Sequence, residues 1–221
     1  MIKEAFVSNN KVLIRDAFIS ILSKESFYDI TVKNIIEVAG VSRSTFYNYY
    51  QDKQVLLKEI QGELIDGFLA VVQDIGDKGL NYLLEAMEGD DYRICESFFS
   101  YIKKKQKYLK VLFKENNGTN FRSVFLVAMN KAAVKVLTHW GLYDAFAANM
   151  FSDYIMQILT AAGIVTFTKW LKSDMKISER DMTCFFFKFW NGNFHADLVN
   201  YAKQRLDSGN DDPDSKDTTA P

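Results

Sequence analysis

The near absence of proline constrains the fold of this chain more than any other feature of its sequence. Residues 1–212 contain no proline, and the two prolines of the chain are Pro213 and Pro221. Because proline lacks a backbone donor and breaks the interior of a helix, a long proline-free stretch favours long helices over loop-rich folds. The 221 residues are 48% hydrophobic and 25% charged, which is a globular composition able to bury a core. We therefore predict an all-α protein, built as one domain or as a small domain joined to a larger one.

Apolar residues at helical spacing predict three short helices followed by a long one. The first helix is expected over residues 11–24, and a second opens at Thr31. Ser42 caps a third helix that runs to Tyr49. The long helix is expected from Asp52 to Gln73, ending at a break over residues 76–79.

The second half of the chain predicts two more long helices, over residues 144–172 and 178–205. Within the first of these, Gly163–Thr168 has a strand-like composition, but the apolar periodicity on both sides favours a helix. Residues 207–221 are polar and acidic, and we expect them to form a disordered tail. The predicted organisation is a small N-terminal domain over residues 1–54 and a larger helical domain over residues 55–206.

Residues 31–53 have the pattern of a helix-turn-helix. Ala39 is small enough for a close helix crossing, and Gly40 can adopt the positive φ of a tight turn. Val41, Phe46 and Tyr50 are expected to pack into the core. A short helix, a tight turn and a second short helix are thus combined in 23 residues.

The other faces of the second short helix are polar. Arg43 and Tyr47 are spaced i, i+4, as are Ser44 and Asn48, and none of the four is needed for packing. A guanidinium, short hydroxyls, an amide and a phenol are the groups that read base edges and phosphates in a major groove. This helix is therefore the predicted recognition helix.

Three flanking residues fit contacts to phosphates. Thr31 and Ser42 stand at helix N-termini, where free backbone N–H groups favour an anion. Lys53 lies in the first turn of the next helix, where the helix dipole mildly disfavours a cation that a nearby phosphate would stabilise.

The stretch Ile14–Leu57, which contains Ala39-Gly40-Val41, Ser44-Thr45-Phe46-Tyr47 and Asp52-Lys53, resembles the DNA-binding domain of TetR-family (TetR/AcrR-like) transcriptional regulators. The resemblance implies an all-helical homodimer whose three N-terminal helices bind DNA. Tyr50 stands where Phe is commoner in that family, so its hydroxyl needs a partner. With the flanking caps and Asn48 included, the predicted DNA-binding residues are Thr31, Ser42, Arg43, Ser44, Thr45, Tyr47, Asn48, Tyr49 and Lys53.

Beyond residue 60 the chain is similar to one branch of the family, through YRICESFFSYIKKKQKYLKVLF and GIVTFTKWLKSDMKISERDM. Helical bundles hold ligands between their helices, and the candidate residues of an effector pocket are Phe98, Phe99, Ile102, Phe125 and Tyr154. Dimers of this family pair through their last two helices. The resemblance thus implies a dimer interface formed by Phe151, Ile155, Ile158, Ala162, Trp170, Phe185 and Phe189.

Lys103–Lys114 contains six lysines and no acidic residue. It is expected to be a solvated helix face, with a supplementary contact to DNA or to an anionic ligand as the alternative. The whole chain has a net charge of −1, and residues 1–60 carry eight basic and seven acidic side chains. DNA binding must therefore depend on a few placed groups and on dimeric avidity, since bulk charge is nearly balanced.

Other classes of site find little support. Cys95 and Cys184 have no neighbouring cysteine, and His139 and His195 have no ligand partner at metal-binding spacing. Nucleophile-elbow, phosphate-loop and zinc-protease motifs do not occur, so no enzyme, cofactor or metal is expected. No signal peptide or membrane span is visible either, and we expect a cytoplasmic protein.

The expected function is a sequence-specific regulator that binds double-stranded DNA at a pseudo-palindromic operator, most often as a repressor released by an unknown small-molecule effector. One alternative is a DNA-binding co-activator controlled by a protein partner. Another is a helical scaffold or enzyme whose DNA-binding domain no longer binds DNA.

Overall fold

The computed structural model describes residues 2–88, 93, 96–148, 150–186 and 188. Within this part of the chain all regular structure is helical, and no helix is long and apolar enough to cross a membrane. The helices are α1 (Ile2–Leu22), α2 (Val32–Ala39), α3 (Arg43–Tyr49), α4 (Lys53–Asp77), α5 (Gly79–Glu88), α6 (Glu96–Lys104), α7 (Gln106–Leu112), α8 (Phe121–His139), α9 (Tyr143–Ala147) and α10 (Ser152–Lys172). A further helical stretch covers residues 179–186.

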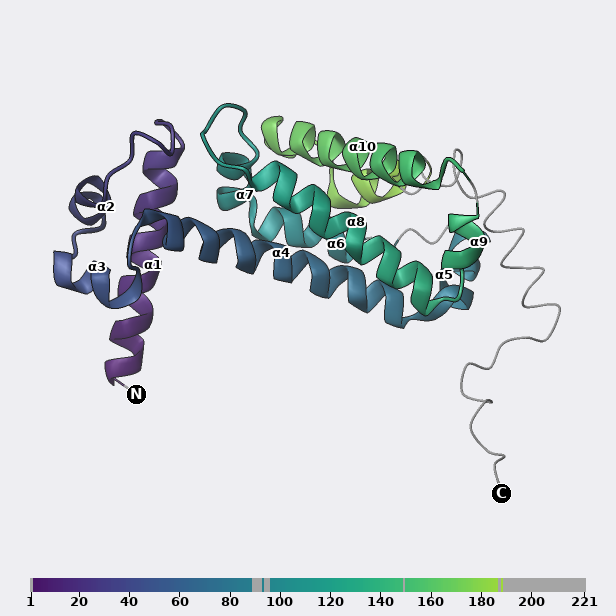
Figure 1. The fold of residues 1–221 in the computed structure, drawn as a ribbon, viewed down its shortest axis with the longest axis horizontal. Coiled ribbons are helices and arrows are strands. Elements are labelled where there is room, and N and C mark those ends of the chain that lie inside the picture. The colour runs from purple at the N-terminus through teal and green to yellow at the C-terminus, as the bar shows by residue number, and fades with distance from the viewer. Residues whose placement is uncertain (1, 89–92, 94–95, 149, 187, 189–221) are drawn as a thin grey trace, which may run out of the picture.

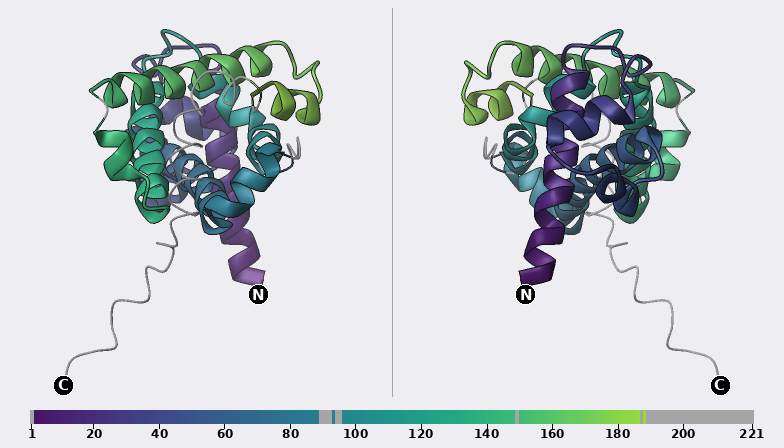
Figure 2. Two further views of the ribbon diagram at one scale, coloured as in Figure 1. Left: turned by 90° about the vertical axis from the view of Figure 1, so that its right-hand side faces the viewer. Right: turned by 90° about the vertical axis from the view of Figure 1, so that its left-hand side faces the viewer.

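The first three helices form a small head, residues 2–50, at one end of an elongated molecule (Figure 1). The long helix α4 leaves the head and runs along the rest of the molecule, which we call the helical domain. There α8 lies between α4 and α10, and α4–α8 is the most extensive helix pairing (Figure 1). Seen along the long axis, α10 lies at the edge of the bundle (Figure 2).

The caps of the helix-turn-helix are formed as the sequence predicts. Thr31 caps α2 and shares a reciprocal capping box with Asn34. Gly40 ends α2 with φ of 65°, in the left-handed region. The hydroxyl of Ser42 accepts the backbone N–H of Thr45 at 3.0 Å and so caps α3.

Helix α4 extends beyond the predicted end at Gln73, and the break falls within the predicted range of residues 76–79. Helix α4 continues through Gly76 to Asp77, and the chain turns only at Gly79, whose φ is 83°. Gly76 is kept within the helix because its neighbours need a small residue there. A Cβ at Gly76 would lie 3.1 Å from Val136, and the indole N–H of Trp140 donates to the Gly76 carbonyl at 2.9 Å.

The predicted helix over residues 144–172 is in fact two helices, the short α9 and the longer α10. The stretch Gly163–Thr168 lies inside α10 and is helical, as the periodicity predicts. Of the helix predicted over residues 178–205, the part up to residue 186 is helical, and residues 189–205 lie outside the described residues, as does the predicted tail.

Aromatic rings fill the interior of the helical domain. Phe68 of α4 is at the centre, with ring centroids 4.7 Å from both Tyr101 and Phe125 and 5.3 Å from Phe98. Phe167 of α10 lies within 5.8 Å of Phe125. Edge-to-face pairs of this kind each contribute about 0.5–1.5 kcal/mol beyond their buried area. The buried residues of the head and of most of the helical domain belong to one continuous cluster, so the head packs directly onto the domain.

Candidate nucleic-acid interface

The predicted recognition helix α3 packs against the core of the head through two aromatic side chains. Phe46 is fully buried and Tyr50 is 1% exposed, and both pack into the core of the head. The hydroxyl of Tyr50 donates to Oε1 of Glu59 in α4 at 2.8 Å, which is the partner its burial requires. Burial and the Glu59 carboxylate raise the pKa of the Tyr50 phenol, so it stays a hydrogen-bond donor at physiological pH. One side of α3 is thereby locked to α4.

The opposite side of α3 is open to solvent. Arg43, Ser44, Tyr47 and Asn48 are all exposed, as expected for residues not needed in packing. The Arg43 guanidinium lies over the Tyr47 ring, 5.6 Å from its centroid. This contact orders two long side chains on the face that presents donors and acceptors. The four predicted base-reading residues therefore share one exposed surface, which we call the α3 face.

Four of the five remaining predicted DNA-binding residues carry hydroxyl groups, which lie at the start of α2 and on α3. Ser42 Oγ lies 2.8 Å from both Ser44 Oγ and Thr45 Oγ1, in a hydroxyl cluster at the start of α3. Thr31 is exposed at the start of α2, and its hydroxyl also contacts Asn34. Thr45 and Tyr49 are half-buried, so less of each side chain is available to a ligand.

Lys53 is placed differently from the sequence expectation. Its ammonium donates to the carbonyl oxygens of Phe27 (2.8 Å), Tyr28 (3.1 Å) and Ile30 (2.6 Å). It also lies 4.8 Å from the centroid of the Phe27 ring. All three N–H donors of a lysine are thus used inside the head. The carbonyl oxygens of the α1–α2 turn therefore stabilise the Lys53 cation at the start of α4. From the sequence alone, we expected a DNA phosphate to provide this negative charge.

A charged network joins α1 of the head to α4. Both terminal nitrogens of Arg15 donate to the Glu63 carboxylate, at 2.7 and 2.5 Å, and Lys11 pairs with Glu59 at 2.9 Å. The hydrogen bond from Arg15 lowers the pKa of Glu63 against an opposing effect of partial burial. Burial opposes the charge of Arg15 itself, yet its bonds to Glu63 leave the pKa of Arg15 raised. Bidentate pairs of this geometry restrict the angle between two helices better than a single bond.

Helix α7 contacts the head through Asp16. The Tyr108 hydroxyl donates to Asp16 Oδ1 at 2.8 Å, and Lys107 pairs with Asp16 Oδ2 at 2.7 Å. Partial burial would raise the pKa of Asp16, but the Lys107 and Tyr108 bonds outweigh it and lower that pKa. Burial and the Asp16 bond raise the pKa of Tyr108 to about 12. The helical domain therefore contacts the head through α7 as well as through α4.

A third contact comes from the loop between α7 and α8, residues 113–120. The backbone N–H of Phe27 donates to the Asn117 carbonyl at 2.8 Å, and Lys114 donates to the Ser23 carbonyl at 3.0 Å. Asn117 is 5% exposed, and its amide group bonds to the carbonyls of Val111 and Leu112 and to Thr119. We call this contact between residues 23–28 and residues 113–120 the loop latch. The sequence carries no local signal for this contact, because it joins segments about 90 residues apart.

The lysine run 103–114 is mostly engaged within the molecule. Lys103 pairs with Glu179 and Lys110 with Asp174, both beyond the end of α10. Lys107 and Lys114 bind the head, as described above. Four of the six lysines thus connect α6, α7 and the following loop to other elements, so the run is neither a simple solvated face nor a free basic patch.

Four of the five candidate pocket residues belong to the hydrophobic core of the described residues or pack against it. Phe99, Ile102 and Phe125 are fully buried in that core, and Phe98 packs against it. Tyr154 is 68% exposed on α10, so the structure does not bring it together with them. The sequence alone cannot distinguish the two cases, because an aromatic residue that fills a core and one that lines a cavity occur at the same helical spacing.

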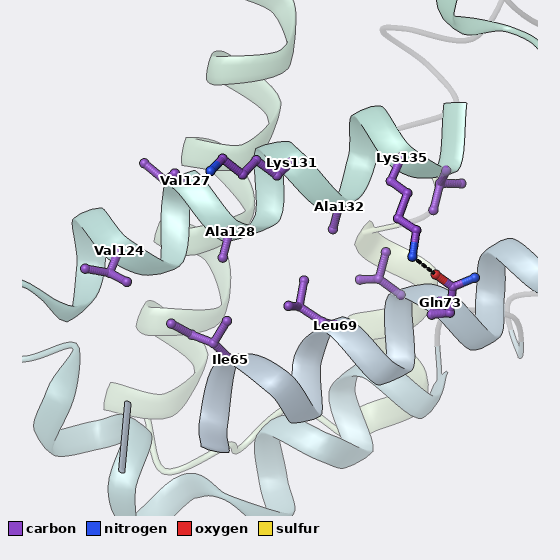
Figure 3. A pocket seen from close by; sticks show the side chains of 11 residues that line it. Ile65, Leu69, Gln73, Val124, Val127, Ala128, Lys131, Ala132 and Lys135 are labelled. Carbon is purple, nitrogen blue, oxygen red and sulfur yellow. Dashed lines mark hydrogen bonds between the residues drawn. The ribbon is translucent and has the colours of Figure 1, made fainter. Parts of the chain in front are cut away.

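A groove of about 420 Å³ lies elsewhere, between α4 and α8 (Figure 3). None of the five candidate residues lines it. Its lining comes from successive turns of the two helices and consists of Ile65, Leu69, Val72, Gln73, Val124, Val127, Ala128, Lys131, Ala132, Lys135 and Val136.

The candidate interface residues divide between surface and core. Phe151, Ile158 and Phe185 are more than half exposed, while Ile155 and Ala162 are half-buried. Trp170 is 3% exposed, and its indole N–H donates to the Ile177 carbonyl at 2.8 Å. Its inclusion in an interface is therefore wrong, because a side chain buried within its own chain offers no surface to a second copy. Phe189 lies outside the described residues, as do Cys95 and His195.

Comparison with known proteins agrees with this architecture. The family profile described as bacterial regulatory proteins, tetR family, matches residues 14–60, and a profile for the C-terminal region of transcriptional regulators of the TetR type matches residues 92–192. No curated protein matches the chain in sequence.

Three solved structures have a similar fold. A TetR transcriptional regulator from Streptococcus agalactiae 2603V is 24% identical, covers 86% of this chain and 97% of its own, and has a TM-score of 0.51. A putative TetR-family regulator from Syntrophomonas wolfei has a TM-score of 0.60 at 14% identity, with 82% and 93% of the two chains covered. The fatty acid degradation regulator FadR from Bacillus halodurans has a TM-score of 0.58 at 14% identity, with 84% and 96% covered. With both profiles matched and the helix-turn-helix formed, the chain is a DNA-binding transcriptional regulator of the TetR family.

Proposed function

We propose that the protein acts as a homodimeric repressor, which binds a pseudo-palindromic operator through two copies of α3 and leaves it when a small molecule binds the helical domain. The observation that carries the DNA-binding part is the division of α3 into a buried aromatic side and an exposed polar side. Phe46 and Tyr50 fix the helix, and Arg43, Ser44, Tyr47 and Asn48 are free to meet base edges. In a symmetric dimer the two copies of α3 would enter successive major grooves about 34–36 Å apart.

The dimer part of the proposal is supported by the outer side of α10. Phe151, Tyr154, Ile158 and Val165 are each more than half exposed there, at spacings that place them along one side of the helix. Phe185 adds a further exposed ring from the stretch after α10. Several large apolar side chains exposed along one side of a helix are unfavourable in water and are typical of a surface that pairs with another.

Control by an effector is supported by the way in which the head and the helical domain are joined. Only Tyr50, Gln51 and Asp52 separate α3 from α4, so a change in the tilt of α4 moves α3 with it. The Arg15–Glu63 pair, the Asp16 contacts with α7 and the loop latch all resist such a change. A ligand that binds better to a differently tilted α4 would thereby weaken operator binding, by linkage.

The test is binding of the purified full-length protein to the DNA that flanks its own coding region. We expect salt-sensitive, sequence-specific retention with protection of two half-sites, one dimer per site. If the protein binds this DNA only as weakly as a shuffled sequence of equal length, the proposal is contradicted. Specific binding that persists with small molecules but responds to a co-purifying protein would support the co-activator alternative instead.

A further inference from the structure

The groove between α4 and α8 has one apolar end and one polar end. Ile65 of α4 and Val124, Val127 and Ala128 of α8 form the apolar end, and Leu69 lies at the middle of the floor (Figure 3). Val124 is 37% exposed and Val127 is 53% exposed, so these methyl groups meet water at the open side of the groove. From Val124 to Lys135 is eleven residues of α8, roughly 16 Å along the helix axis.

The polar end carries positive charge. Lys131 and Lys135 are spaced i, i+4 on α8, where like charges repel each other mildly. Lys135 donates to Gln73 Oε1 at 3.0 Å, and Gln73 in turn donates to Asp77 at 2.6 Å. Within the described part of the chain, Lys131 has no hydrogen bond or ion pair, and its side chain lies along α8 toward Val127 (Figure 3).

None of the described residues that line the groove is acidic. Many other lysines of the protein are paired with a carboxylate, as Lys103, Lys107 and Lys110 are. In the groove, by contrast, Lys135 bonds to the neutral Gln73 amide, Lys131 extends toward Val127, and neither ammonium has a carboxylate partner among the described residues. An anion would complement these two charges, and the adjoining aliphatic wall would favour an apolar body attached to it.

We propose that this groove binds an amphipathic anion, with an aliphatic body along Ile65, Leu69 and Val127 and an anionic head at Lys131 and Lys135. This inference rests on the proposed function, because it identifies the chemical class of the effector. Bound there, the ligand contacts both α4, which continues into α3 through three residues, and α8, which follows the loop of the latch. It therefore acts on the two elements that set the position of the head.

The first experiment is calorimetric titration of the full-length protein with decanoate and with decanol, each below its aggregation concentration. We expect decanoate to bind at least ten times more tightly than decanol near pH 7. The double variant Lys131→Gln/Lys135→Gln should bind both probes with similar, weak affinity. The control variant Lys104→Gln/Lys169→Gln removes two exposed lysines elsewhere and should keep the preference for decanoate. Equal affinity of the unmodified protein for both probes, or an unchanged preference in the Lys131/Lys135 variant, overturns the proposal.

The second experiment locates the ligand by methyl NMR. Decanoate should shift the methyl signals of Leu69, Val124 and Val127, and Val127→Asp should abolish both the shifts and the binding by placing a carboxylate at the open side. Decanoate-induced shifts confined to another region would overturn the proposal. So would methyl groups of the groove that are shielded by a second copy of the chain and do not respond to decanoate.

A third measurement separates this inference from the proposed function. Operator binding is measured by fluorescence anisotropy without ligand and then with decanoate. Specific operator binding with no decanoate binding contradicts the groove proposal and leaves the proposed DNA-binding function standing. Decanoate binding in the groove together with absent operator binding contradicts the function and supports the groove as an anion site. Both binding events with release of the operator support the two proposals together.

Discussion

The backbone N–H of Phe27 donates to the carbonyl oxygen of Asn117 across 2.8 Å, joining residues that are 90 positions apart. Phe27 belongs to the turn between α1 and α2, and Asn117 to the loop between α7 and α8. The bond therefore connects the DNA-binding head to the segment that precedes α8. Together with Lys114 and the Ser23 carbonyl, it forms a contact that any movement of the head against the helical domain must stretch or break.

Substituting Gly118 tests the loop latch. Gly118 has φ of 75°, and a Cβ there would lie 2.8 Å from Ser26 Oγ and 3.0 Å from the Tyr28 ring. We expect Gly118→Ala to lower the free energy of unfolding by about 1–3 kcal/mol, because alanine is strained at positive φ and also pushes the head away. Urea denaturation measures the change.

Gly62→Ala is the matched control. Gly62 lies inside α4, and a Cβ there meets nothing within 4 Å. Alanine should stabilise the helix at this position by about 0.5–1 kcal/mol. If both alanine variants stabilise the protein, residues 113–120 do not hold the head as described.

Lys53→Met distinguishes a structural lysine from a phosphate-binding one. The substitution removes the ammonium that bonds to three carbonyl oxygens of residues 27–30 and keeps most of the aliphatic chain. We expect the free energy of unfolding to fall by about 1–3 kcal/mol, since hydrogen bonds to a charged group are lost. Lys58→Met, at an exposed position on the same helix, should change it little.

The dependence of operator affinity on salt provides the second readout for Lys53. If its donors stay within the head, the slope of log affinity against log salt in Lys53→Met stays as in the unmodified protein. A slope smaller by about 1 with unchanged stability would instead indicate that Lys53 contacts a phosphate.

The Arg15–Glu63 and Asp16–Lys107 pairs predict a loss of stability in acid. The pKa of Glu63 is held below its ordinary value by the Arg15 bond, and that of Asp16 by Lys107 and Tyr108. A carboxyl group with a depressed pKa in the folded state stabilises the fold above its unfolded pKa, near 4, and loses that contribution as the pH falls through its folded pKa. We expect the free energy of unfolding to decline between about pH 5 and pH 3, and Glu63→Gln to show a shallower decline. An identical pH profile for Glu63→Gln would show that the Arg15 pair does not contribute.

Arg43 is expected to carry base recognition. Arg43→Ala removes an exposed guanidinium from the α3 face and should cost about 1–3 kcal/mol at the operator while relaxing sequence preference at one or two base pairs. Lys33→Ala removes an exposed cation of the head from α2 and serves as the control. It should weaken operator and shuffled DNA equally. Loss of sequence preference in both variants, measured by competition binding, would contradict the special role of Arg43.

The exposed side of α10 predicts the oligomeric state. Ile158 is 65% exposed on that side, so Ile158→Glu should leave the fold intact and shift the protein from dimer to monomer in light scattering. Ile177→Glu, at a half-exposed isoleucine beyond the end of α10, is the control and should remain dimeric. A dimer that survives Ile158→Glu unchanged would place the interface elsewhere.

The helix-turn-helix could be predicted from the sequence almost residue by residue, because its signals are local. Thr31 and Ser42 cap helices with their own side chains, Gly40 ends a helix through its own φ, and Phe46 and Tyr50 are paired by helical spacing. Even the partner required by the Tyr50 hydroxyl was foreseeable, although its identity as Glu59 was not.

The features that could not be predicted depend on contacts between residues that are distant in the sequence. The three carbonyl partners of Lys53 lie 23 to 26 positions away. The Phe27–Asn117 bond joins backbone atoms, so the identity of the two side chains does not indicate it. Trp170 and Phe125 have the composition of an interface or a pocket, but only the packing of the folded chain shows that they are buried. The groove between α4 and α8 could not be predicted, because valine and alanine at helical spacing normally indicate a buried core.

The uninterrupted length of α4 has a mechanical consequence. Its 25 residues span about 37 Å, so a rotation of only about 5° about its far end displaces the near end by roughly 3 Å. In a dimer the two heads would move in opposite directions, doubling the change in their separation. A displacement near the groove that is too small to disturb the packing of Phe68 would thus be amplified into a mismatch between the two heads and the helical repeat of DNA. Under the proposed function, the length of this one helix would therefore set how strongly a small ligand affects DNA binding.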